Sequence, residues 1–225
     1  MSIGRILASE LLESRDPGTG RWLRQFTNGS GHSYPLYYFT PSITRDNRFM
    51  VIHRVQDGWL NLWRLDLAGG ELLQFTDGHT RDAGWAIWGE RDVQGVYDHL
   101  SALNRDSSEV WHFDGTGLFA THLETLRQRQ VWELGDRICI SQNDFSPDGK
   151  RFVFVHADRG HYLDAVARHS WATHEAWRNS VPCVVGCIDV ATGGYRAVAE
   201  LPFHVHHAVF VGPASVLLNH IQDGL

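Results

Sequence analysis

Met50-Val51-Ile52-His53, followed by Gln56-Asp57-Gly58, decides the fold, because the chain repeats this pattern twice more. The second copy lies between Phe152 and Gly160, and the third lies between Leu217 and Gly224 and ends the chain. Each copy is an apolar run, then a histidine, then a turn that contains Asp and Gly. Self-similarity of this kind is typical of repeat architectures. The pattern indicates that the chain stops inside a repeat.

Short strands joined by tight turns surround these copies. Gly and Asn adopt the positive φ that hairpin turns require, and Asp and Pro favour turns for related reasons. Four strands, named a to d in chain order, are therefore expected in each unit. The expected turns lie at Asp46-Asn47, Gly69-Gly70, Glu124-Thr125, Pro147-Asp148-Gly149 and Gly193-Gly194.

The sequence predicts an all-β chain that forms one partial β-propeller domain over residues 1–225. Propeller blades are repeats of about 40–50 residues, and a ring needs about four to eight of them. About three and a half blades are counted, so the ring is incomplete. The competing architecture is an all-β sandwich, which also uses short strands with regular turns. The predicted units are an orphan strand at about 21–27, blades at about 39–78, 86–134 and 144–201, and a half blade at 208–225.

Composition excludes several classes of function. The net charge is −6 and the 20 Lys and Arg residues form no cluster, so a nucleic-acid partner is not expected. No apolar stretch has the length of a membrane span or follows the first charges as a signal peptide would, which predicts a cytoplasmic protein without a membrane partner. The three cysteines, at 139, 183 and 187, form no metal-binding pair and are expected to be small buried side chains.

Histidine is abundant, with 14 residues, and strand order predicts that 13 of them lie on one rim of the propeller. His53, His99, His156 and His220 are placed at the ends of b strands, and His112 in an insertion after a b strand. Two interpretations stay open. The repeated histidine stabilises the turn that follows it, or this rim is a polar binding face.

Phe203-His204-Val205-His206-His207 is more specific. On an extended backbone His204 and His206 point the same way, and imidazoles at this spacing often bind zinc or manganese. These two residues are weak metal-ligand candidates, whereas His207 points to the other face.

The insertion from His161 to Pro182 combines aromatic and basic residues, among them His174, Trp177 and Arg178. Aromatic faces stack on sugar rings and Arg pairs with carboxylates, which suits an acidic sugar. A helix that only covers the rim would explain the same residues.

At this point the chain resembles the N-terminal half of the oligogalacturonate lyases, seven-bladed propellers related to the TolB propeller. The resemblance extends over nearly the whole chain. It is carried by Asp16-Pro17-Gly18-Thr19-Gly20, Arg24-Gln25-Phe26-Thr27, Tyr37-Tyr38-Phe39, Asp57-Gly58-Trp59-Leu60-Asn61, Gln74-Phe75-Thr76, Thr173-His174-Glu175, His207 and His220.

The resemblance implies metal-assisted β-elimination of pectin-derived oligogalacturonides, with Mn²⁺ as cofactor. It implies that His207 is the catalytic base, and that His174, Arg178, His220 and Trp59 bind substrate. It also implies that the metal ligands lie beyond residue 225, so this chain alone is expected to be incomplete for activity. The family's substrate-binding arginine beside the cysteine of the third blade has no counterpart at Pro182-Cys183-Val184.

Three hypotheses follow. The first is a lyase acting on an oligogalacturonide or another uronate-containing oligosaccharide. The second is a non-catalytic propeller that binds protein or sugar, and the third is a fragment that does not fold stably. Open blade faces would favour self-association in each case where the chain folds.

Overall fold

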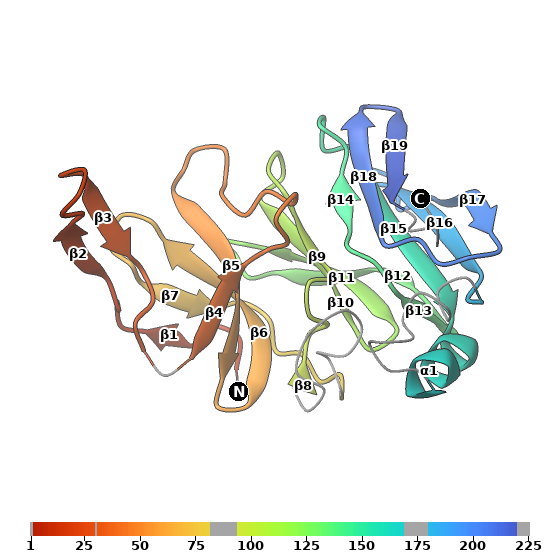
Figure 1. Ribbon diagram of the computed structural model, residues 1–225, viewed down its shortest axis with the longest axis horizontal. Coiled ribbons are helices and arrows are strands. Elements are labelled where there is room, and N and C mark those ends of the chain that lie inside the picture. Colours follow the sequence, from red (N-terminus) through yellow and green to blue (C-terminus); the bar gives the residue numbers. More distant parts are fainter. Residues whose placement is uncertain (1, 30, 82–93, 169–179, 220–225) are drawn as a thin grey trace.

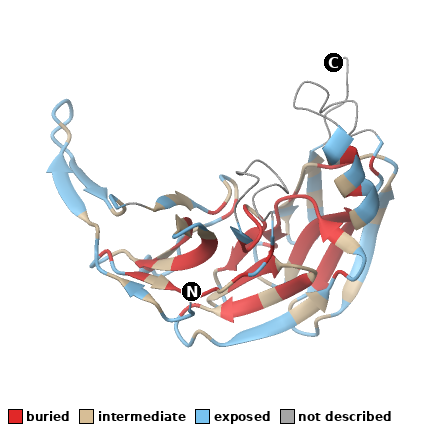
Figure 2. Ribbon diagram, turned by 90° about the horizontal axis from the view of Figure 1, so that it is seen from below, coloured by how far each residue is buried: buried red, intermediate tan, exposed pale blue. Residues whose placement is uncertain are grey.

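The computed structural model describes residues 2–29, 31–81, 94–168 and 180–219. Within these residues the chain contains nineteen strands and one helix, α1 (Arg159–Arg168), which confirms the predicted all-β class. Three antiparallel sheets follow one another along the chain, with a two-stranded hairpin at each end (Figure 1). The sheets lie along a curved path, and buried residues line the interior of each (Figure 2). No described helix has the length and apolar character needed to cross a membrane.

The first sheet contains four strands in the expected a-to-d order. These are β4 (His32–Pro35), β5 (Phe49–Gln56), β6 (Trp59–Asp66) and β7 (Leu72–Gln74). β1 (Ile6–Leu7) pairs with the outer side of β7, and β8 (Gln94–Gly95) runs parallel to β6. The a strand begins earlier than the predicted start near Phe39, because Tyr34 and Pro35 pair with His53 and Ile52.

The second sheet differs from the sequence prediction in its first two strands. Its order is β9 (Ser101–Asn104), β10 (Glu109–Asp114), β11 (Gly117–His122) and β12 (Gln128–Glu133). His112 therefore lies inside the b strand, and His99 precedes the a strand instead of ending the b strand. The alternation of Val110, Trp111 and Phe113 explains this placement, since all three side chains are buried and fill the core on both faces of the sheet.

The third sheet has a divided a strand, because β13 (Arg137–Cys139) and β14 (Asp144–Phe145) both pair with β15 (Arg151–Asp158). β16 (Cys183–Asp189) and β17 (Tyr195–Leu201) complete it. β18 (His207–Gly212) and β19 (Ser215–Asn219) form a hairpin beside it. At the other end of the chain, the strand predicted at about 21–27 exists as β3 (Trp22–Gln25), paired with β2 (Leu12–Arg15).

The repeated Asp/Gly turn has two structural outcomes. Asp57 and Gly58 have φ values of 54° and 81° and join β5 to β6 in a two-residue hairpin turn, as expected. In the second copy, the Asp158 carboxylate accepts a hydrogen bond from the His161 backbone N–H at 2.7 Å and caps α1. An Asp at the end of a b strand therefore supports either a turn or a helix start. The third copy's turn lies outside the described residues.

The main hydrophobic core joins the second sheet, the third sheet and the β18–β19 hairpin. Trp111, Phe152 and Phe154 are fully buried in it, together with Val205 and Ala208. All three cysteines are free and buried, in agreement with the sequence prediction.

Candidate functional site

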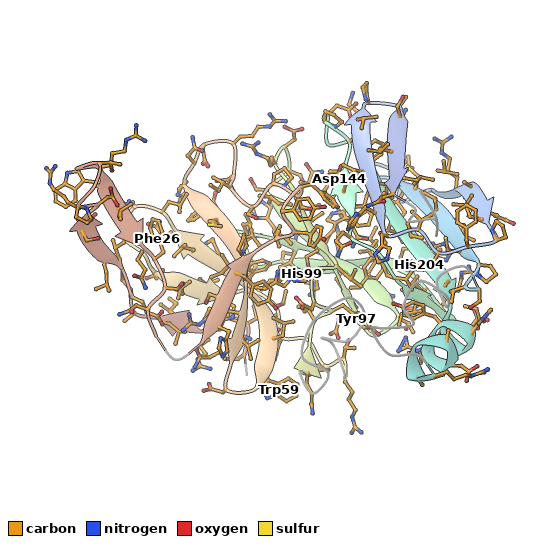
Figure 3. All side chains as sticks on the ribbon, in the orientation of Figure 1. Phe26, Trp59, Tyr97, His99, Asp144 and His204 are labelled. Atoms are coloured by element: carbon orange, nitrogen blue, oxygen red, sulfur yellow. The ribbon has the colours of Figure 1, made fainter. Side chains whose placement is uncertain are left out.

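The first strands of successive sheets lie side by side and form a common wall. β14 contacts β9 on one side and β18 on the other. Gln142, just before β14, forms a parallel bridge with His207, and Ser141 donates a hydrogen bond to the His206 carbonyl oxygen. Figure 3 places His99 near the middle of the molecule, between Tyr97 and Asp144. Histidines that are distant in sequence therefore meet along this wall.

His207, the predicted catalytic base, is half-buried at the start of β18 among aromatic rings. Its ring centroid lies 5.3 Å from those of Tyr37 and Phe39 and 6.3 Å from that of Tyr38. The side-chain nitrogen of Asn219 lies 3.1 Å from its Nδ1. Tyr38 is 79% exposed, which leaves a large aromatic surface open to solvent beside the imidazole.

His204 and His206, the weak metal candidates, have adjacent rings, as their spacing predicts. Their centroids are 4.7 Å apart and the rings are perpendicular. His204 is buried, and its Nε2 lies 3.3 Å from the Ile140 carbonyl oxygen, which suits an N–H donor more than a metal ligand. Among the described residues no third His, Cys or carboxylate completes a ligand group with this pair. Within the described residues the two histidines therefore do not form a complete metal-ligand group.

One group of three ligand-type side chains does occur in the described part of the chain. It comprises His53 from β5, with Asp98 and His99 from the segment that leads into β9, and its ligand atoms lie within 4.8 Å of one another. Burial lowers the pKa of His53 to about 3, with the neighbouring His99 acting in the same direction. Burial also raises the pKa of Asp98 and lowers that of His99.

The other b-strand histidines are also buried, but their neighbours differ. His112 lies 3.5 Å from the Gln128 amide nitrogen and stacks on Phe119. The Nε2 of His156 lies 2.8 Å from the Tyr195 hydroxyl, and its Nδ1 contacts the Arg137 side chain. Burial lowers the pKa of both histidines to about 4. Both residues are buried inside their sheets, so they do not belong to a solvent-exposed binding face, which is one of the two interpretations of the repeated histidine.

The predicted substrate-binding residues are only partly placed. Trp59 begins β6 and packs edge-on against His79, with centroids 6.4 Å apart, and no described contact joins it to His207. His174, Arg178 and His220 lie outside the described residues.

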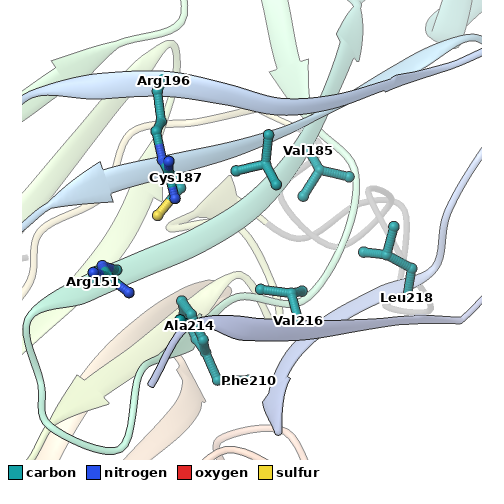
Figure 4. A pocket seen from close by; sticks show the side chains of 9 residues that line it. Arg151, Val185, Cys187, Arg196, Phe210, Ala214, Val216 and Leu218 are labelled. Atoms are coloured by element: carbon teal, nitrogen blue, oxygen red, sulfur yellow. The ribbon is translucent and has the colours of Figure 1, made fainter. Parts of the chain in front are cut away.

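A second concave surface lies between the third sheet and the β18–β19 hairpin (Figure 4). Its lining is mostly apolar, with Val185, Phe210 and Val216, and Arg151 and Arg196 lie at one side. None of the predicted site residues that the structure describes lines this groove.

Comparison with solved structures explains the arrangement of the sheets. An oligogalacturonate lyase from Vibrio parahaemolyticus superposes with a TM-score of 0.75 at 14% identity, covering 94% of this chain and 52% of that one. An oligogalacturonate lyase in complex with manganese gives 0.76 at 18% identity, with the same coverages. The chain has the fold of half a β-propeller. It spans about half the length of these lyases.

The same half-propeller fold matches TolB from Acinetobacter baumannii, with a TM-score of 0.54 at 15% identity over 99% of this chain and 48% of that one. No protein-family model and no curated protein matches the sequence. At these identities the likeness concerns the half-propeller fold alone.

Sequence reasoning missed Asp98 and Tyr34, which lie beside His53. Neither belongs to the repeated pattern, and Asp98 is 45 positions from His53 in the numbering of the chain. The Tyr97-Asp98-His99 sequence, just before β9, is the only local signal for Asp98. Tyr34 is the cross-strand partner of His53 in the β4–β5 pair. Asp98 comes close to His53 because the first and second sheets pack against each other in one hydrophobic cluster.

Proposed function

We propose that this half-propeller belongs to an enzyme that cleaves uronate-containing oligosaccharides, such as oligogalacturonides, by β-elimination. The observation that carries the proposal is the pairing of His207 with the exposed ring of Tyr38. An exposed aromatic face can stack on a sugar ring, and an imidazole is a suitable base near neutral pH. The structural likeness to two oligogalacturonate lyases supports the same class of substrate.

In the proposed reaction, His207 removes the proton from C5 of the uronate. The electron pair forms the C4–C5 double bond, the bond between C4 and the glycosidic oxygen breaks, and that oxygen takes a proton from water; the hydroxide so formed receives the proton held by His207. The Asn219 side chain lies 3.1 Å from His207 Nδ1 and would hold the imidazole in place through a hydrogen bond to that nitrogen. Asn219 would then act as a positioning residue.

Manganese, when bound to the uronate carboxylate, would spread the charge that develops as C5 loses its proton. His204 and His206 are the residues of this chain that would contribute to holding it, and they do not form a complete ligand set. The proton transfer to His207 and the cleavage of the C4–O bond are therefore described with residues of this chain alone. We also propose that Arg178 and His174 bind the substrate carboxylates. A cytoplasmic location is a further proposal.

The test uses a fusion of this chain to the complementary half of the manganese-containing lyase, supplied with Mn²⁺ and trigalacturonate. The proposal predicts a rise in ultraviolet absorbance from the 4,5-unsaturated product. His207→Ala should abolish the rise without weakening trigalacturonate binding, and Asn219→Ala should lower kcat and shift the pH profile. A folded fusion that binds trigalacturonate without turnover would contradict the proposal and favour the non-catalytic alternative.

A further inference from the structure

His53, Asp98 and His99 meet where the first and second sheets contact each other. His53 lies in the b strand of the first sheet, whereas the other two residues precede the a strand of the second. Their ligand atoms lie within 4.8 Å of one another, and His99 Nε2 is 3.6 Å from an Asp98 carboxylate oxygen. Zinc–nitrogen bonds of about 2.0–2.1 Å put the ligands of a tetrahedral site roughly 3.3 Å apart. A side-chain movement of about 1 Å would therefore close the group around an ion.

His53 has an unusual environment for a buried polar side chain. It is fully buried, and the Pro35 carbonyl oxygen is the one hydrogen-bond acceptor recorded near its ring among the described residues, so one ring nitrogen has no partner. Leaving a buried donor or acceptor unsatisfied is unfavourable. A metal ion bound to one nitrogen would satisfy it, because neutral imidazole is a metal ligand.

His99 adopts a backbone conformation that side chains rarely take. Its φ is 57°, in the left-handed region, where residues other than glycine are uncommon. Such conformations cluster at functional sites. His99 Nε2 lies 3.6 Å from an Asp98 carboxylate oxygen, and among the described residues no Lys or Arg side chain forms an ion pair with that carboxylate.

Tyr34 contacts two of the three ligand-type residues and holds them in place. Its hydroxyl donates a hydrogen bond to Asp98 at 2.8 Å, and its ring stacks on His53 with centroids 5.3 Å apart. Metal-binding carboxylates are commonly held by such outer hydrogen bonds, which orient them toward the ion.

We propose that His53, Asp98 and His99 bind a divalent transition-metal ion, such as Zn²⁺, that links the first sheet to the second. Two imidazole nitrogens and one carboxylate oxygen are a common ligand set for zinc, with water in the fourth position. The site is separate from the histidines at β18. Tyr37 lies between them, with ring centroids 5.5 Å from His99 and 5.3 Å from His207. Because the ligands come from two sheets, the ion would stabilise the contact between them.

The test is zinc binding by the full chain, measured by competition with a chromophoric chelator, together with the visible spectrum after Co²⁺ substitution. We expect one tightly bound ion per chain and the intense bands of tetrahedral Co²⁺. His53→Leu and Asp98→Asn should each weaken binding on the order of 100-fold, and Tyr34→Phe on the order of 10-fold.

The variants must fold, and control variants must distinguish this site from the other histidines. His53→Leu removes an unsatisfied buried group, and His99→Asn tolerates positive φ, so both should fold while losing the ion. His156→Gln is the matched control in the third sheet and should bind zinc like the wild type. Absence of tight binding by the wild type would overturn the proposal. Retention of the ion in His53→Leu with its loss in His206→Ala would overturn it too, by assigning the ion to the other histidines.

Discussion

At the residue scale, the same histidine position has a different chemistry in each sheet. His53 faces a carboxylate and a second imidazole, His112 faces an amide, and His156 contacts Tyr195 and Arg137. The repeat in the sequence predicts that His53 and His156 lie in b strands, and both do, although each strand continues for a few residues beyond the histidine. It does not predict their neighbours, because these come from strands outside the repeated pattern. Candidate sites in repeat proteins therefore depend on the contacts between units.

Tyr38 gives a direct test of substrate stacking beside His207. Replacing it with Ala removes an exposed aromatic face, so KM for trigalacturonate should rise several-fold in the fusion enzyme while kcat changes little. Tyr38→Phe keeps the ring and should behave like the wild type. An unchanged KM in Tyr38→Ala would show that the sugar does not stack there.

Asp144 predicts a specific pH dependence of stability. Burial raises its pKa to about 6, although the backbone N–H groups of Phe210 and Phe145 act in the opposite direction. The unfolded chain has a carboxyl pKa of about 3.9, so the folded state binds the proton more tightly. Stability from this group is therefore present below about pH 4 and is lost as the pH rises through about 6.

Asp144→Asn removes that titration. Its free energy of unfolding relative to the wild type should increase by about 2 kcal/mol between pH 4 and pH 7, measured by urea denaturation. The exposed Asp148, whose hydrogen bonds to Ser146 and Lys150 lower its pKa, is the control. Asp148→Asn should show no such gain, and a pH-independent difference for Asp144→Asn would refute the assignment.

At the element scale, the turns show how far local sequence determines structure. Asp57-Gly58 forms the expected hairpin turn because both residues tolerate positive φ. Asp158 caps α1 instead, because its carboxylate accepts a hydrogen bond from the His161 backbone N–H in the first helical turn. The pairing of β2 with β3 was not predictable, since the strand at 22–25 resembles the d strand of a blade.

Glu10 holds the N-terminal segment against the first sheet. Its carboxylate lies 2.7 Å from Arg54 Nη2 and also accepts hydrogen bonds from the Asn28 and Gly29 backbone N–H groups. The Arg54 side chain is only 1% exposed, so Glu10→Ala leaves a buried charge without its carboxylate. We expect a loss of about 3 kcal/mol in the free energy of unfolding.

Thermal and urea denaturation of this Glu10 variant would measure the loss. The double variant Glu10→Ala/Arg54→Leu removes both charges and should recover part of the lost stability. If Glu10→Ala alone changes stability by less than about 0.5 kcal/mol, a value typical of surface pairs, the ion pair does not hold the segment.

At the scale of the whole molecule, the curved row of sheets exposes apolar side chains at both ends. Trp22 and Leu23 lie on the N-terminal hairpin, and Val211 and Leu217 lie on the C-terminal one; all four are about half exposed or more. The sequence predicts the incomplete ring from its count of repeats. It does not predict which side chains stay exposed, because this depends on how the terminal hairpins pair.

We predict that the chain self-associates through these ends, because exposed apolar surfaces of this kind favour burial against a partner. Sedimentation equilibrium should show a dimer or larger species. Trp22→Ser/Leu23→Ser should shift the equilibrium toward monomer without lowering the melting temperature, and the solvent-facing control Thr19→Ser should not. A wild-type chain that is monomeric at all concentrations would contradict this prediction.

We propose above all that an acidic sugar binds at His207, on the wall formed by the first strands of the sheets. The most direct measurement is a titration of the chain with trigalacturonate, followed through the histidine imidazole signals in the nuclear magnetic resonance spectrum. Binding at His207 should give saturable shifts of the His207 signals and leave the signals of the buried His156 and of His122, the last residue of β11, unchanged. Saturable shifts confined to other histidines, or no shifts at all, would contradict it.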